Sequence, residues 1–137
     1  MELRHRIRVR YSECDAQGIV FNANYLNFFD VALTELWRQA FGGYEQAVAE
    51  HGADVVVAEA MVRYRAPVRF DEEIDLVLRI ARLGNTAMSS RIAIERRGEV
   101  AAEGEIRHVF VLPETHEKTS IPDGVRTALE PYLVGEE

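Results

Sequence analysis

The chain begins with strict alternation of polar and apolar residues. Arginines at positions 6, 8 and 10 are interleaved with Ile7, Val9 and Tyr11. Alternation with a period of two is typical of a β-strand that has one buried and one solvated face. We therefore predict a strand that leads directly into a loop containing Asp15 and Gly18.

A helical periodicity begins at Asn24, which we predict to be the N-cap of a long helix. Gly42-Gly43 marks the end of that helix, because glycine adopts the left-handed conformation that terminates many helices. A second short helix is predicted over residues 44–51. The apolar residues at helical spacing in the long helix are Tyr25, Phe28, Phe29, Ala32, Leu33, Leu36, Trp37, Ala40 and Phe41.

From residue 54 the period returns to two for almost sixty residues and indicates four strands, separated at Gly84-Asn85 and Arg97-Gly98 among other places. One polar and one apolar face per strand is typical of an antiparallel sheet covered on one side. The predicted fold is α+β, a curved five-stranded antiparallel sheet around one long central helix. Pro122 opens a short terminal helix. The length of 137 residues predicts a single domain over 1–137.

Composition narrows the function classes. A net charge of -7 disfavours a general nucleic-acid partner. The single cysteine, Cys14, excludes an internal disulfide framework and indicates a reducing compartment. No apolar run approaches membrane-spanning length, so we expect a cytoplasmic protein without membrane insertion. The histidines show no ligand spacing, so no metal is expected.

The loop before the long helix is the strongest candidate for chemistry. Backbone N–H groups at a helix N-terminus lack intrahelical partners, and the helix dipole adds partial positive charge there. A carbonyl placed between Asp15 and these N–H groups would be polarised for attack. Gly18 would let the backbone approach a substrate closely. The alternatives are a cap or turn role for Asp15 and an ordinary turn for Gly18.

Two segments carry a family resemblance. The run from Tyr11 to Tyr25 has an aromatic residue, Cys-Asp, Gly-Ile-Val, a second aromatic residue and Asn-Tyr, in that order. The second segment, Tyr64 to Glu72, reads YRAPVRFDE. The chain resembles the acyl-CoA thioesterases of the hotdog fold, in the group typified by 4-hydroxybenzoyl-CoA thioesterase and the Tol-Pal-associated thioesterases.

The resemblance implies that Asp15 is the catalytic carboxylate and that the backbone N–H groups near Asn22 form an oxyanion hole. The substrate would be an acyl-CoA, with no further cofactor. Protomers would pair their sheets edge to edge into a dimer, and dimers could assemble into a homotetramer. Two departures matter: the Tol-Pal-associated members have His where Asn22 stands, and related hydratases have His where Val20 stands. The hydratase alternative therefore lacks its acid or base.

The remaining alternatives concern which residues bind the substrate, how the thioester is attacked, and whether the protein is an enzyme at all. Phe21 and Tyr25 are candidates for an acyl pocket, with packing in the core as the other reading. Asp15 can act as nucleophile or as general base. Cys14 has no neighbouring His to activate its thiol, so it is not expected to be a nucleophile. The alternative function is a non-catalytic protein that binds acyl-CoA or an acyl carrier. The candidate contacts to coenzyme A phosphates are Arg63, Arg65 and Arg69, with solvated positions on the strand faces as the alternative.

Overall fold

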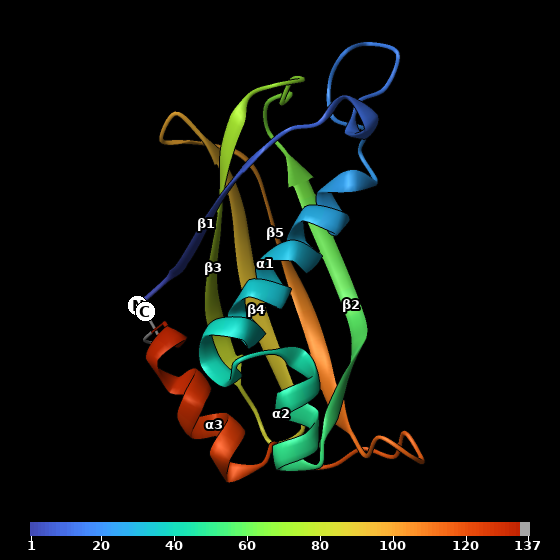
Figure 1. The fold of residues 1–137 in the computed structure, drawn as a ribbon, viewed down its shortest axis with the longest axis vertical. Helices are drawn as coiled ribbons and strands as arrows, with labels where there is room; N and C mark the ends of the chain where they lie inside the picture. Colours follow the sequence, from blue (N-terminus) through green and yellow to red (C-terminus); the bar gives the residue numbers. More distant parts are fainter. Residues whose placement is uncertain (135–137) are drawn as a thin grey trace.

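The computed structural model describes residues 1–134, which form a five-stranded antiparallel sheet with a long helix lying across one face (Figure 1). The strand order is β1-β3-β4-β5-β2, so the two strands nearest the N-terminus occupy opposite edges. The helices are α1 (Asn24–Phe41), α2 (Tyr44–His51) and α3 (Asp123–Leu129). The strands are β1 (Leu3–Arg8), β2 (Asp54–Tyr64), β3 (Glu73–Leu83), β4 (Ala87–Arg96) and β5 (Glu99–Val111).

The face of the sheet against α1, here called the inner face, forms the hydrophobic core. The predicted apolar stripe of α1 is buried from Tyr25 to Trp37, and it packs on fully buried residues of β3 and β4. Gly104 of β5 lies under Phe29, and a Cβ atom there would stand 2.8 Å from the Phe29 ring. The structure confirms the predicted hotdog fold. The buried inner-face residues of β3 and β4 are Ile74, Leu76, Leu78, Ile80, Met88, Ile92 and Ile94.

Two local predictions near the start of α1 are wrong. Asn24 is the first residue of the helix and not its N-cap, because its side-chain amide donates instead to the backbone oxygen of Glu13 at 2.9 Å. This bond ties the helix to the preceding loop. Tyr11 does not continue the buried row of the first strand: it lies in a 3₁₀ turn and is 79% exposed, because β1 ends at Arg8. Leu3 contributes to the core in its place.

The edge strand β2 differs most from its sequence pattern. A β-bulge between Val57 and Glu59 shifts the register, so Val57 and not Ala58 pairs with the inner-face residue His108. The inner row of β2 after the bulge consists of Ala60, Val62 and Tyr64. At the two ends of the inner row Val57 is 60% exposed and Tyr64 is 54% exposed, whereas Val62 packs partly buried against the core.

The remaining elements follow the predictions. The β4–β5 hairpin turns at Arg97-Gly98, where both residues have positive φ, and α3 begins after Pro122. Beyond α3 the N–H of Val134 donates to the backbone oxygen of Ile80 at 2.8 Å. Among the described helices, none is both long and apolar enough to cross a membrane. The predicted domain extends to residue 137, and its last three positions lie outside the described residues.

Candidate active site

Asp15 sits in a tight turn that holds its carboxylate in one direction. Its backbone N–H donates to the oxygen of Ile19 and its own oxygen accepts from Gly18 N–H, both at 2.9 Å. The N–H of Gln17 donates to Oδ1 of Asp15 at 2.8 Å. Within residues 1–134, the second carboxylate oxygen, Oδ2, has no hydrogen-bond partner. The turn therefore orients Asp15 while leaving one oxygen available.

Gly18 makes this turn possible. Its φ of +76° lies in the left-handed region, where a side chain is strained. The space around its Cα is open, because an added Cβ would meet no atom within 4 Å. The backbone therefore favours glycine at this position, and the open space lets another molecule approach.

The loop is anchored at its far end by the segment after β2. The N–H of Val20 donates to the oxygen of Val68 at 2.8 Å, and Ile19 forms a bridge with Arg69. The N–H of Phe21 donates to the oxygen of Glu13 at 2.9 Å. The two sequence segments that carry the family resemblance are thus in direct contact.

The start of α1 presents unpaired donors next to this loop. The N–H groups of Asn24 and Tyr25 donate to the oxygens of Phe21 and Asn22, at 2.9 and 3.3 Å. The N–H groups of Asn22 and Ala23 donate to no acceptor in the described part of the chain. The helix dipole places partial positive charge at the same end. These two N–H groups are suited to bind an oxygen that gains negative charge.

Tyr64 is a site residue that sequence reasoning missed. Its hydroxyl donates to the backbone oxygen of Asn22 at 3.0 Å. Its ring meets the Tyr25 ring edge to face, with the centroids 5.0 Å apart. Tyr64 opens the second resemblance segment, but nothing in its strand pattern indicates this partner. It fixes the peptide group next to the unpaired donors.

The two predicted acyl-pocket aromatics lie in different environments. Phe21 is 47% exposed on the surface beside the loop, whereas Tyr25 is 3% exposed. Burial raises the pKa of the Tyr25 hydroxyl, so it stays protonated. Phe21 is therefore available to a ligand directly, and Tyr25 packs edge to face against the ring of Tyr64.

The three predicted arginines are not gathered at one point. Arg63 pairs in register with Glu103 on the outer face of the sheet, opposite α1. Arg65 forms an ion pair with the same Glu103. Arg69 adjoins the Asp15 loop through its bridge to Ile19. Only Arg69 is placed beside the loop by contacts within the chain.

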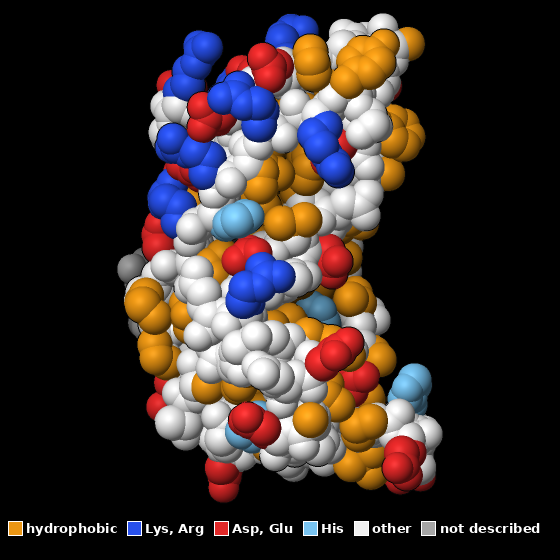
Figure 2. All heavy atoms as spheres, in the orientation of Figure 1, with side chains coloured by type: hydrophobic (Ala, Val, Ile, Leu, Met, Phe, Trp, Pro, Cys, Tyr) orange, Lys and Arg blue, Asp and Glu red, His pale blue; other side chains and the backbone are white. Residues whose placement is uncertain are grey.

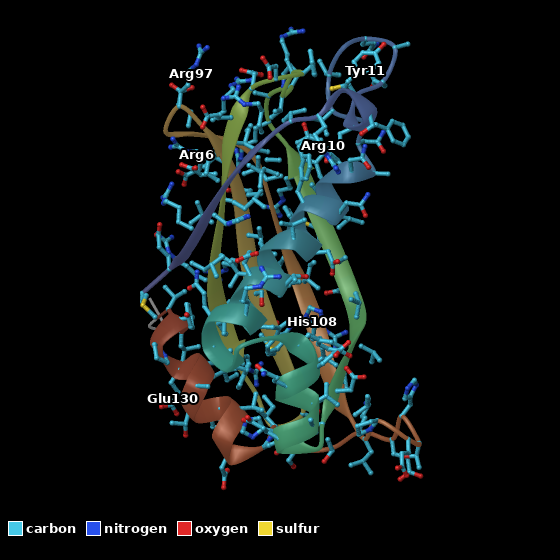
Figure 3. All side chains as sticks on the ribbon, in the orientation of Figure 1. Arg6, Arg10, Tyr11, Arg97, His108 and Glu130 are labelled. Carbon is cyan, nitrogen blue, oxygen red and sulfur yellow. The ribbon has the colours of Figure 1, made fainter. Side chains whose placement is uncertain are left out.

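A cysteine nucleophile and a metal site have little support among the described residues. Burial, with the nearby charge of Asp15, raises the pKa of the Cys14 thiol, which disfavours the reactive thiolate. No group of three His, Cys, Asp or Glu side chains is arranged to hold a metal ion in residues 1–134. The loop and the helix start remain the place where chemistry is supported by geometry. Figure 3 shows Arg10 and Tyr11 at this end of the molecule, where β1 passes into the loop.

Comparison with known proteins places the chain in a family. A family model described as the thioesterase-like superfamily matches residues 9–129. The acyl-CoA thioester hydrolase YbgC of Escherichia coli O6:H1 is 29% identical over 124 residues, which cover 89% of this chain and 91% of that protein. The family match confirms the predicted resemblance and the prediction of a thioesterase.

Solved structures agree with the fold. The protein TT1821 from Thermus thermophilus superposes with a TM-score of 0.86 and 31% identity, covering 98% of this chain and 100% of that one. The gentisyl-coenzyme A thioesterase BH1999 superposes with a TM-score of 0.81 and 23% identity, covering 93% of this chain and 98% of that one. At that lower identity the likeness shows the fold alone.

Proposed function

The chain belongs to the thioesterase-like superfamily, and on that basis we propose that it hydrolyses acyl-CoA thioesters to a free acid and coenzyme A. The observation that carries the proposal is the pairing of two features. The turn at Asp15 leaves one carboxylate oxygen available, and the next helix begins with unpaired N–H groups at Asn22 and Ala23. The name of the Escherichia coli relative, an acyl-CoA thioester hydrolase, supports the same substrate class.

The reaction assigns a role to each feature. With Asp15 as general base, its carboxylate takes a proton from water as the water oxygen bonds to the thioester carbon. The carbonyl oxygen becomes negative and is held by the N–H groups of Asn22 and Ala23, each such donor being typically worth roughly 2.7–4 kcal/mol. The carbon–sulfur bond then breaks, and the departing sulfur takes the proton back from Asp15, so coenzyme A leaves as the thiol.

A second route keeps the same residues. Asp15 attacks the thioester carbon directly, the thiolate leaves, and water hydrolyses the resulting mixed anhydride. Gly18 provides the close approach that either route requires. If water attacks the Asp15 carboxyl carbon of the anhydride, a single turnover in H₂¹⁸O puts the label into Asp15 and not into the product acid, whereas the general-base route puts the label into the product acid.

Substrate binding is proposed to involve the residues beside the loop. Phe21 contacts the acyl thioester, and Tyr25 shapes the pocket through Tyr64. Arg69 is best placed to meet coenzyme A phosphates from the same chain, because its backbone is held against the loop. Arg63 and Arg65 remain candidates that would meet a substrate bound at the outer face.

The test is thiol release from a panel of short, long and aromatic acyl-CoAs. We expect Asp15→Asn, which removes the charge with little change in shape, to lower kcat/KM at least about a hundredfold. Asp123→Asn, at the start of α3, is the matched control and retains activity. Equal turnover by the wild type and Asp15→Asn would contradict the assignment. Binding without turnover by the wild type would favour the alternative of a non-catalytic acyl-binding protein.

A further inference from the structure

A surface groove lies at the end of the sheet that carries the Asp15 turn, and the proposed chemistry does not use it. Its volume is about 420 Å³, within the range of roughly 300–1,000 Å³ that is typical of small-molecule sites. Figure 3 labels Tyr11 and Arg97 at this end of the molecule, and Figure 2 shows arginine side chains gathered there beside hydrophobic ones. The lining of the groove includes Arg8, Phe70, Asp71, Glu73, Arg96 and Arg97.

The groove begins next to the candidate active site. The N–H of Phe70 donates to the backbone oxygen of Gly18 at 3.4 Å, so Phe70 adjoins the Asp15 turn. The Phe70 side chain is 51% exposed and meets the ring of Tyr11, which is 79% exposed, edge to face with the centroids 5.7 Å apart. Two exposed aromatic rings that support each other form a platform on which another flat ring can stack.

Three arginines line the groove beyond this aromatic pair. Arg8, at the end of β1, forms an ion pair with Glu73 at 2.8 Å. Arg96, at the end of β4, lies 3.4 Å from a carboxylate oxygen of Glu72. These contacts hold the first two guanidinium groups in place. Arg97, by contrast, is exposed and forms no ion pair and no side-chain hydrogen bond with any residue in the part of the chain that the structure describes.

Backbone strain occurs at the same groove. Among residues 1–134, three residues other than glycine have a positive φ, and two of them, Asp71 at +69° and Arg97 at +54°, line the groove. Arg97 and Gly98 form the β4–β5 turn, and two positive φ angles in such a turn favour Asn-Gly over an arginine. Strained residues of this kind are concentrated at functional sites. The guanidinium of Arg97 is therefore available to a ligand.

We propose that this groove binds the adenine nucleotide of coenzyme A. The adenine stacks on the platform of Tyr11 and Phe70, and the phosphates meet Arg97 with the two arginines beside it. The groove thereby makes the protein specific for coenzyme A thioesters over the thioesters of a carrier protein, which lack the nucleotide. This inference rests on the proposed function, which places the thioester at Asp15.

The chemistry of the groove favours a nucleotide over an acidic protein surface. Guanidinium groups bind phosphate through paired hydrogen bonds, and an aromatic ring stacks on any base. The three arginines share the lining with three carboxylates, so the groove carries no net charge that would attract a large acidic surface. The carboxylates are acceptors for the amine of adenine and the hydroxyl of ribose. The arm of coenzyme A between thioester and diphosphate is long and flexible, so the phosphates can lie beyond the Asp15 turn.

The experiment compares thioesters with and without the nucleotide. The most active acyl group of the panel is presented on coenzyme A and on pantetheine, and kcat/KM is measured for the wild type, Arg97→Asn and Phe70→Leu. We expect the wild type to prefer the coenzyme A thioester about a hundredfold. Each variant should lower kcat/KM for that thioester about tenfold and leave the value for the pantetheine thioester unchanged.

The variants are chosen so that loss of the fold does not explain the result. Arg97→Asn removes the guanidinium and creates the Asn-Gly sequence that the turn favours. Phe70→Leu keeps an apolar side chain at an exposed position and removes the flat ring. The matched control is Arg107→Gln, which removes an exposed arginine from β5 and keeps the wild-type preference.

Inhibition by free adenosine bisphosphate, the nucleotide end of coenzyme A, identifies the source of the ligand. We expect inhibition that is competitive with the acyl-CoA and about tenfold weaker in Arg97→Asn. Non-competitive inhibition would assign the groove to a free nucleotide and overturn the inference. Equal kcat/KM of the wild type for both thioesters, or wild-type kinetics in both variants, would also overturn it and leave hydrolysis at Asp15 intact.

A binding measurement separates this inference from the proposed function. Calorimetric titration of Asp15→Asn with coenzyme A reports affinity without turnover. Binding that is weakened by adding Arg97→Asn, and not by adding Arg107→Gln, supports the groove even if the wild type hydrolyses neither thioester. Affinity that is the same in all three proteins would contradict the groove.

Discussion

The hydroxyl of Tyr64 donates a 3.0 Å hydrogen bond to the backbone oxygen of Asn22 and so connects the end of β2 to the start of α1. The same peptide segment carries the unpaired N–H groups proposed to hold the oxyanion. The Tyr64 ring is in turn held edge to face against Tyr25. An edge strand thereby holds the segment that leads into α1, 42 residues earlier in the chain.

The first prediction concerns that bond. Tyr64→Phe keeps the ring contact with Tyr25 and removes the hydroxyl, so the Asn22 oxygen retains its 3.3 Å bond from the Tyr25 N–H but loses the shorter bond that orients its peptide. We expect kcat to fall about tenfold with little change in KM, equivalent to about 1.4 kcal/mol of transition-state stabilisation. Steady-state kinetics with the best acyl-CoA of the panel measures this. Tyr132→Phe, which removes a hydroxyl that donates to Gln39, is the control and leaves kcat unchanged. Wild-type kcat in Tyr64→Phe would refute the positioning role.

The second prediction separates strain from function at Gly18. Gly18 and Gly98 have nearly equal φ angles of +76° and +79°, and an added Cβ meets no atom within 4 Å at either position. Replacement by alanine should therefore lower the free energy of unfolding by about 1–2 kcal/mol at each of the two sites. We expect only Gly18→Ala to lower activity as well, because only it lies in the Asp15 turn. Urea unfolding and kinetics of both variants test this, and equal loss of activity in both would contradict it.

The third prediction is a pH dependence of stability. The guanidinium of Arg6, helped by Arg4, holds the pKa of Asp75 below its usual range. A carboxylate with a lowered pKa in the folded state stabilises the fold above its unfolded pKa and loses that contribution as the pH falls through the folded value. Asp75→Asn should lower the free energy of unfolding by about 1 kcal/mol or less at neutral pH. The difference from the wild type should shrink below about pH 4.

Urea titrations at pH 7 and pH 3 measure both values. A difference that stays constant between them would show that Asp75 acts through its shape and not through its charge. Because Arg6 is largely exposed, salt should also reduce the difference at pH 7.

The fourth prediction concerns assembly. One edge of β2 pairs with no strand among the described residues, and the strand exposes Val56, Val57 and Met61. Unpaired edges with apolar side chains tend to pair with another chain. We predict a homo-oligomer, so light scattering should give at least twice the chain mass of 15.6 kDa. Val56→Lys, which adds charge to the edge, should shift the mass toward one chain, and a wild-type mass of one chain would exclude the assembly.

Much of the fold was predictable because the relevant signals are local. Period-two alternation and the helical stripe of α1 reflect which side chains face the core, and each stripe is contained in one segment. The same holds for the turn at Asp15 and Gly18, where a carboxylate and a residue able to take positive φ stand close together in the sequence. These features indicate the candidate site from the sequence alone.

Two features that the sequence predicts wrongly, the N-cap of α1 and the inner row of β2, depend on contacts between distant segments. Asn24 was predicted as an N-cap, yet its amide bonds to Glu13, because packing of the loop offers a better acceptor than the helix itself. The bulge in β2 changes which residues face inward, and a one-residue shift reverses the faces of a strand. Neither effect appears in the periodicity of a single segment.

The sequence by itself determined the strands, the long helix, the family and the loop with Asp15, because these follow from side-chain periodicity and from residues adjacent in the chain. Tertiary structure alone decided that Tyr64 reaches Asn22, that Arg63 and Arg65 lie across the sheet from α1, and that buried polar atoms of His108 and Ser90 have no partner among residues 1–134. Each of these relationships depends on the register between strands and on how far α1 covers the sheet. Register and coverage arise from packing many segments at once, so no single stretch of sequence contains them.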